Sequence, residues 1–268
     1  MPFILVCEQP PATALVFGGI LSEQVESSRH PGVPWVLVNL VTALRMRGLD
    51  AEGLFRVPGR ALRVQQIESL ANTDRLISDD ELFDGRVIAS AIKRYLAALP
   101  DSLLDVDAFV PIMAKEFGRS VRTPAGLARA LGQMQAALTS SIGCPGGRIA
   151  HGRESGWRSA TLNYVMCLLR EVVSLRAYNR MSPRALALCL SPALFGTTDN
   201  AETNSQVLEF LIEHWPWLSS GLHRRGGQPV SALNPPVFLP KIVSTPAGKS
   251  LLPLLTAATL SVECTLSY

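Results

Sequence analysis

A single arginine, Arg56, lies in a short segment whose composition can hold a side chain in a fixed place. Residues 53–59 read Gly-Leu-Phe-Arg-Val-Pro-Gly. The two glycines allow backbone turns closed to other residues, and Pro58 fixes one φ angle. Leu54 and Phe55 can insert into a core while Arg56 points to solvent. Such a segment presents a rigid cation that can stabilise negative charge on a neighbouring group. The alternative is an ordinary surface loop whose arginine forms an ion pair.

Two other segments resemble phosphate-binding loops only in part. Residues 139–157 are rich in glycine and serine, but they contain no G-x-x-x-x-G-K-[ST] pattern and no strand is expected before them. Residues 248–250 read Gly-Lys-Ser, but Val243 stands where the first glycine of that pattern belongs. We therefore expect residues 139–157 to be an inserted surface loop.

Groups for independent catalysis are not found in any recognisable spacing. There are no paired carboxylates, no nucleophile–base set and no metal-binding cluster. The five cysteines are scattered, form no C-x-x-C and have no histidine beside them at zinc-ligand spacing; they are Cys7, Cys144, Cys167, Cys189 and Cys264. This pattern favours reduced, mostly buried thiols in a cytosolic protein.

The composition is that of a folded protein: of 268 residues, 47% are hydrophobic and 18% charged. A net charge of +3, without a basic stripe interleaved with aromatic residues, does not support nucleic-acid binding. The N-terminus lacks the positive region of a signal peptide and soon meets Glu8. No apolar run reaches the roughly 18 residues of a membrane-spanning helix. We expect a cytoplasmic protein without a transmembrane segment.

Helices on either side must position Arg56. Apolar residues at i, i+4, i+7, i+8 and i+11 predict a helix over residues 34–47; they are Val33, Leu37, Leu40, Val41 and Leu44. Arginines in its last turn suit the helix dipole, and Gly48 is suited to end it. A second helix is predicted at about 60–71, with Leu62, Ile67 and Leu70 facing inward.

A third helix, residues 85–98, is predicted with Asp84 as its N-cap. Its inward row is Val87, Ile88, Ala91, Ile92, Tyr95 and Leu96, and Lys93 and Arg94 lie at its solvent edge. Further helices are predicted at about 105–117, 124–138, 158–176, 183–190 and 203–218. The pattern predicts an all-α fold: an irregular segment over 1–16, one helical domain over 17–219 and a flexible, Pro/Gly/Ser-rich tail over 220–268.

Several separated segments of this chain resemble the RhoGAP domain family, and they occur in the family's order. They are residues 17–21, Val33-Pro34, residues 47–59, residues 89–96 with Leu99-Pro100, and residues 179–181 followed by Leu186-Ala187 and Pro192. The resemblance spans the predicted helical domain and excludes residues 139–157 and the tail.

This resemblance implies an all-helical domain that binds a Rho-type small GTPase and accelerates its GTP hydrolysis. Arg56 matches the family's arginine finger, which stabilises charge on the transferring phosphoryl group. Lys93 matches a lysine of the GTPase interface, and Arg94 and Asn179 are further expected partner-binding residues. The protein would be a regulator rather than an enzyme with a complete active site. GTP and Mg²⁺ would be held by the partner, with no cofactor of its own.

Some positions differ from the family pattern. Ala97 stands where the family usually has an arginine, four residues after the lysine, and Ala185 stands where it usually has an asparagine. Ser102 replaces a usual proline, and residues 190–192, Leu-Ser-Pro, replace Phe-Gly-Pro. The alternative function is therefore a RhoGAP-like interaction module that binds a GTPase or another signalling protein without accelerating hydrolysis.

Overall fold

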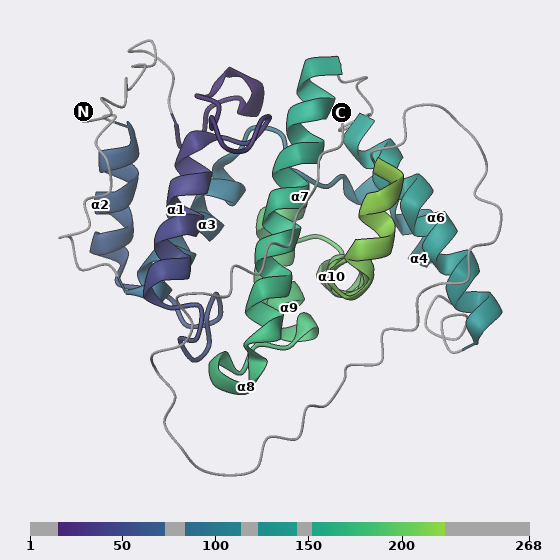
Figure 1. The fold of residues 1–268 in the computed structure, drawn as a ribbon. Helices are drawn as coiled ribbons and strands as arrows, with labels where there is room; N and C mark the ends of the chain where they lie inside the picture. Colours follow the sequence, from purple (N-terminus) through teal and green to yellow (C-terminus); the bar gives the residue numbers. More distant parts are fainter. Residues whose placement is uncertain (1–15, 73–83, 114–122, 144–151, 223–268) are drawn as a thin grey trace, which may run out of the picture. The chain divides into compact units, whose positions relative to one another are not determined.

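A computed structural model describes residues 16–72, 84–113, 123–143 and 152–222, and the regular elements within these ranges are helices (Figure 1). They are η1 (Leu21–Glu23), α1 (Trp35–Arg47), α2 (Ala61–Asn72), α3 (Gly85–Ala98), η2 (Val106–Ala108), α4 (Val110–Met113), α6 (Pro124–Gly143), α7 (Gly152–Ser174), α8 (Arg176–Asn179), α9 (Pro183–Phe195) and α10 (Ala201–Leu222). The described ranges contain no β-strand, only an isolated bridge between Glu26 and Pro34. The predicted all-α class is confirmed.

Helix α1 forms as its sequence pattern predicts. It begins after Pro34 and ends at Gly48, whose N–H donates to the Leu44 carbonyl at 3.0 Å. All five residues of the predicted stripe are buried. α1 packs against α3, and α3 also packs against α2 and α9 (Figure 1). The two helices that flank the Arg56 segment are thus joined through α3.

Helix α3 confirms both its predicted cap and its predicted inward row. The Asp84 carboxylate accepts a hydrogen bond from the Val87 N–H at 2.8 Å, which satisfies one of the free donors at the start of the helix. All six residues of the inward row are buried. The start of α3 is therefore fixed in place, and Lys93 and Arg94 lie two turns further along.

The predicted inward face of α2 is partly wrong. Leu62 is 75% exposed, whereas Val64, Ile67 and Ala71 are buried. Because a helix turns 100° per residue, positions five apart such as 62 and 67 lie about 140° away from each other, and both cannot face the core. Val64, Ile67 and Ala71, which are three and four residues apart, form the buried face of α2 instead.

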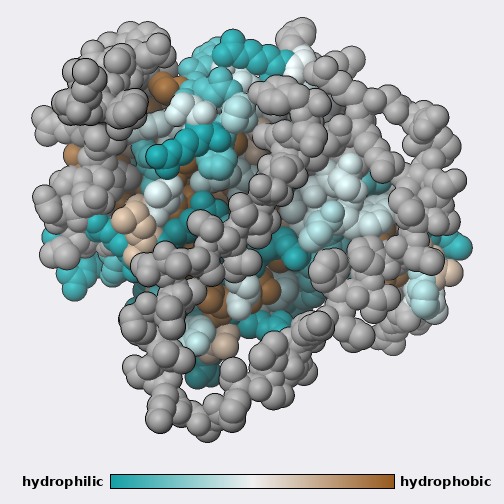
Figure 2. Space-filling model, viewed as in Figure 1, coloured by the Kyte–Doolittle hydropathy of each residue, from teal (hydrophilic) through white to brown (hydrophobic). Residues whose placement is uncertain are grey.

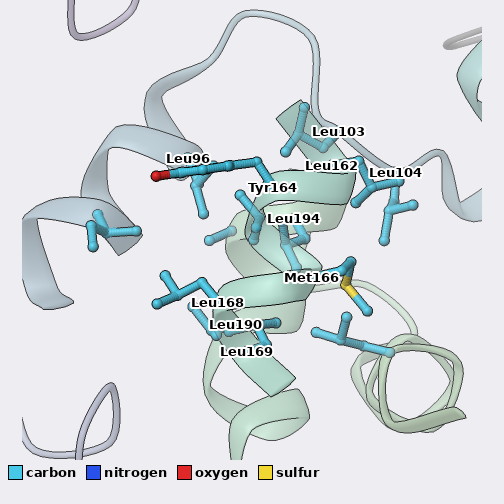
Figure 3. Packing of buried hydrophobic residues seen from close by; sticks show 14 of the residues in the cluster. Leu96, Leu103, Leu104, Leu162, Tyr164, Met166, Leu168, Leu169, Leu190 and Leu194 are labelled. Atoms are coloured by element: carbon cyan, nitrogen blue, oxygen red, sulfur yellow. The ribbon is translucent and has the colours of Figure 1, made fainter. Parts of the chain in front are cut away.

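A large part of the core lies among α7, α9 and α10. Leu162 and Leu169 from α7 lie together with Leu190 and Leu194 from α9 (Figure 3). Met166 is fully buried among them. Hydrophobic residues of the described part are visible on the molecular surface only in small separate areas on the face in Figure 2. Most large apolar side chains of the described residues are buried.

Several helices are longer than predicted, and residues 139–157 are not one loop. α6 continues to Gly143 and α7 begins at Gly152. The polar side chains of this region find partners: Thr139 donates to the Gln135 carbonyl at 3.0 Å, and the Ser141 hydroxyl accepts from the Asp105 N–H at 2.7 Å. The bond from Asp105 ties the helix at Ser141 to a distant part of the chain, which helps helix continue through a sequence that is typical of loops.

Other boundaries shift as well. α9 passes through Pro192 to Phe195, and α10 extends to Leu222. Of the helix predicted at 105–117, the described residues show η2 and α4, and residues 114–117 lie outside the described ranges. Within the described ranges, no helix combines the length and apolar character needed to cross a membrane. The predictions for residues 1–15, for the tail from residue 223 and for Cys7, Cys144 and Cys264 lie outside the described residues.

Candidate functional site

The segment from residue 48 to residue 59, here named the Arg56 loop, begins at a contact between two glycines. A Cβ added to Gly48 would lie 3.1 Å from the Gly85 Cα, and one added to Gly85 would lie 2.7 Å from the Gly48 carbonyl oxygen. A side chain has no room at Gly85, and at Gly48 it would require the neighbouring backbone to move by a few tenths of an ångström. The end of α1 and the start of α3 therefore meet backbone to backbone, and this contact sets where the loop departs.

Within the loop, a tight turn sets the backbone of Arg56. The N–H groups of Arg56 and Val57 both donate to the Gly53 carbonyl at 2.8 Å. Gly53 and Phe55 have φ angles of 70° and 67°, in the left-handed region. For a residue with a Cβ this conformation costs about 1–2 kcal/mol. Burial of Phe55, which is 5% exposed, and of the fully buried Leu54 offsets this cost.

Helix α3 holds the loop at both ends. The Gly59 N–H donates to the Ser90 hydroxyl at 2.8 Å. A Cβ on Gly59 would lie 2.5 Å from the Val87 Cα, so the loop here lies directly against the helix backbone. Near the other end, the Arg86 guanidinium donates to the Glu52 carbonyl at 3.0 and 3.2 Å.

Asn179, at the end of α8, supports the loop from its inner side. Its backbone carbonyl accepts from the Gly53 N–H at 2.8 Å. Its side-chain amide donates to the carbonyls of Leu49 at 2.9 Å and Val172 at 2.8 Å, and its side-chain oxygen accepts from the Met181 N–H at 2.9 Å. Asn179 has 0% exposure. Its contacts are with this chain, and it offers no exposed atom to a partner.

The Arg56 side chain itself is exposed. No ion pair holds it within the part of the chain that the structure describes. Its charge, together with that of Lys93, acts on the thiol of Cys189 in α9. Burial raises the pKa of Cys189, and the two cations oppose this rise. The loop, α3 and α9 therefore bring two cations near one half-buried thiol.

The neighbouring positions show what surrounds the two cations. Lys93 is half-buried on α3, and Ala97 is exposed one turn further along the same helix. Ala185 is half-buried in the first turn of α9, and its N–H donates to the Ser182 hydroxyl at 3.1 Å. Helices α3 and α9, which carry Ala97 and Ala185, pack together. At both positions the chain has a methyl group where the family pattern has a hydrogen-bonding side chain, an arginine or an asparagine.

Arg94 is held on a different side of α3. Its Nε lies 2.7 Å from a carboxylate oxygen of Glu68 in α2, and the two side chains are 52% and 26% exposed. An ion pair as exposed as this stabilises by about 0–1 kcal/mol. A partner that binds Arg94 would have to compete with Glu68, and the pair does not direct the Arg94 charge toward Ala97.

The sequence predicted that Arg56 and Lys93 act together, and in the structure the charges of both act on the thiol of Cys189. The sequence analysis did not find the contacts that Ser90 and Arg86 make with the Arg56 loop, or the position of Cys189 near the two cations. The sequence could have pointed to Ser90, because this residue lies with Lys93 in residues 89–96, a segment that resembles the family. No such signal pointed to Arg86 or Cys189, because their roles depend on contacts between distant parts of the chain.

Comparison with known proteins identifies the class of domain. Residues 34–135 match the family model of the RhoGAP domain. This range contains α1 to α3 and most of α6, with the whole Arg56 loop and Lys93. The match covers segments through which the sequence resembles this family, including the whole Arg56 loop.

Individual relatives agree with this assignment. The Rho GTPase-activating protein SYDE1 of Homo sapiens is 27% identical over 274 residues, which cover 90% of this chain and 35% of that protein. The Rho GTPase-activating protein 21-A of Xenopus laevis is 27% identical over 224 residues, covering 80% of this chain and 11% of that protein. The chain thus spans about a third or less of the length of these curated relatives.

A solved structure shares the fold. The crystal structure of human Rho GTPase-activating protein 15 superposes with a TM-score of 0.57 at 20% sequence identity, covering 76% of this chain and 91% of that chain. The similarity covers more of the chain than residues 34–135, and it supports the helical architecture described above.

Proposed function

We propose that this chain stimulates GTP hydrolysis by a Rho-family small GTPase, with Arg56 supplied in trans as an arginine finger. The observation that carries this proposal is the combination of an exposed guanidinium with a rigid backbone. The Arg56 side chain is exposed, while the loop beneath it is fixed by α3 and Asn179. The RhoGAP match and the relatives named as Rho GTPase-activating proteins support the same function.

The chemistry asked of this chain is electrostatic. During hydrolysis negative charge builds on the oxygens of the transferring phosphoryl group, and a GTPase without its own arginine benefits from a borrowed cation. Arg56 acts on charge that develops in the transition state, so it contributes to the rate more than to binding. The partner holds GTP and Mg²⁺. Lys93, on the rigid α3 beside the loop, contributes to the docking surface.

A second candidate function is binding of a small GTPase without stimulation of hydrolysis. The observation that favours it is the pair Ala97 and Ala185, whose methyl groups cannot hydrogen-bond to a finger or to a partner. Arg94 does not replace the missing charge at Ala97, because it is paired with Glu68 on α2. Arg56 would then be present without the arginine and asparagine side chains that the family pattern places at positions 97 and 185.

Single-turnover GTP hydrolysis separates the two functions. A panel of Rho-family GTPases loaded with GTP is measured with and without the chain, using wild type and Arg56→Ala. Stimulation that Arg56→Ala reduces by about 10³-fold or more supports the arginine finger. Binding without stimulation, unaffected by Arg56→Ala, supports the interaction module. For either function we place the protein in the cytoplasm, brought to membranes through its partner.

A further inference from the structure

Asn179 connects parts of the chain that lie far apart in sequence. Its amide reaches Leu49, 130 residues earlier, and its backbone carbonyl accepts from Gly53. It also bonds Val172 at the end of α7 and Met181 before α9. We propose that Asn179 is a positioning residue for Arg56, acting from inside the domain without touching the partner. This inference rests on the function proposed above.

The path from Asn179 to Arg56 is short. The Asn179 carbonyl holds the Gly53 N–H, and the Gly53 carbonyl in turn accepts from the N–H groups of Arg56 and Val57. Both the N–H and the carbonyl group of Gly53 are therefore held by hydrogen bonds. A displacement of Asn179 moves the anchor of the turn that carries Arg56, with only one residue between them.

The loop needs such an anchor because its backbone is not in a relaxed conformation. Phe55, directly before Arg56, has a φ of 67°, which an L-residue adopts only when its surroundings impose it. A loop freed from Asn179 can return Phe55 to an ordinary conformation, and this rotation redirects the next side chain, that of Arg56.

Asparagine suits the position because every polar group of its side chain is used. The two amide hydrogens serve carbonyls from two different segments, and the side-chain oxygen accepts from the N–H two residues on, which forms an Asx-turn. Arg180, at φ 59°, lets the chain turn back to close it. Aspartate lacks the donors for Leu49 and Val172, and alanine lacks all three bonds.

The consequence is a selective effect on rate. Lys93 lies on α3, a helix packed against α1, α2 and α9, so the docking surface does not depend on Asn179. Loosening the loop leaves this surface intact but spreads Arg56 over several positions. A misplacement of about 1 Å at a catalytic group can cost about 10²-fold in rate.

The experiment compares Asn179→Asp and Asn179→Ala with the matched control Asn204→Ala. Asn204 is also buried, at 1% exposure, and its amide donates to the Asp199 carbonyl at 2.9 Å, but it lies in α10 away from the loop. The single-turnover rate is measured at saturating protein with a Rho-family GTPase that wild type stimulates. Affinity for the GTP-bound partner and the melting temperature are measured alongside.

We expect the Asn179 variants to lose about 10- to 100-fold of the stimulated rate, with affinity changed by less than about threefold. Asn204→Ala should keep the wild-type rate. If the Asn179 and Asn204 variants lose rate in step with their melting temperatures, Asn179 is only structural and the inference is overturned. Should both Asn179 variants fail to fold, Asn179→Ser replaces them, because a serine can still accept from Met181 while losing the reach to Leu49.

Amide hydrogen exchange distinguishes failure of this inference from failure of the proposed function. It is measured on the chain alone, at Gly53, Arg56 and Val57. Faster exchange confined to these amides in the Asn179 variants upholds Asn179 as the anchor of the loop, even if wild type stimulates no GTPase in the panel. Unchanged exchange in the Arg56 loop overturns the inference whatever the activity.

Discussion

Gly59→Ala is expected to disable the site without touching Arg56. A Cβ at this position would lie 2.5 Å from the Val87 Cα, 2.7 Å from the Val87 nitrogen and 2.9 Å from the Arg86 carbonyl oxygen. The first distance is about 0.9 Å short of the 3.4 Å at which ordinary van der Waals contact begins. All three atoms belong to the backbone of α3, which is packed into the core and cannot retreat. The loop must therefore move away by roughly 1 Å.

The expected cost follows from that displacement. Overpacking of this kind lowers the free energy of unfolding by about 1–3 kcal/mol, which corresponds to a decrease in melting temperature of roughly 2–12 °C. A shift of about 1 Å at the base of Arg56 is expected to reduce the stimulated rate about 100-fold. The affinity for the GTP-bound partner should change little, because α3 and Lys93 stay in place.

The assay is single-turnover hydrolysis at saturating protein, together with a thermal melt. Gly132→Ala is the matched control: Gly132 lies in α6, is exposed, and an added Cβ would meet nothing within 4 Å. It should stabilise the protein by about 1 kcal/mol and leave the rate unchanged. A Gly59→Ala protein that stimulates as well as wild type would show that the contact with α3 does not place Arg56, and the argument for a rigidly held finger would fail.

Four further predictions concern individual residues. Arg56→Lys should fail to restore the stimulated rate, measured by single turnover, because a point charge cannot make the forked contact of a guanidinium; full activity would exclude that contact. Lys93→Ala should weaken binding of the GTP-bound partner, measured by titration, while the rate at saturation is largely kept. Ala97→Arg combined with Ala185→Asn should raise the stimulated rate if the missing side chains limit it, and no increase would show that they do not. Burial, followed by a nearby arginine charge, lowers the pKa of His214, so the stability it provides is complete above the ordinary histidine pKa of 6.5 and is lost as the pH falls below it. The free energy of unfolding of His214→Gln, from urea titrations at several pH values, should therefore decrease less steeply with falling pH than that of wild type.

The sequence predicted the helices that are marked by apolar spacing and capping residues within a short stretch of chain. α1 and α3 were found because their apolar residues recur at helical spacing and because Gly48 and Asp84 mark their ends. The position of Arg56 between them followed from the same signals. The face of α2 was partly wrong, because Leu62 was judged by its type rather than by its angle to Ile67. Hydrophobic type alone does not say which side of a helix is buried.

The rest of the site could not be predicted from local pattern. Residues 139–157 look like a loop, and the bond from Asp105 to Ser141 that helps to hold helix there joins residues far apart in sequence. Asn179 was expected to bind a partner, but the structure buries it beneath the Arg56 loop. Its bonds join residues more than a hundred positions apart, and no periodicity in the sequence reports such a contact.

The bond between Leu49 and Asn179 also has a consequence for biosynthesis. It closes 130 residues of chain, and at a translation rate of roughly 5–20 residues per second the ribosome takes roughly 7–26 s to add them. During that time Arg56 exists as a residue but its loop lacks an anchor. The Arg56 loop of the nascent chain therefore cannot be anchored until α8 has emerged and docked. If the chain acts as proposed, its activity requires that the segments around Leu49 and Asn179 have folded together.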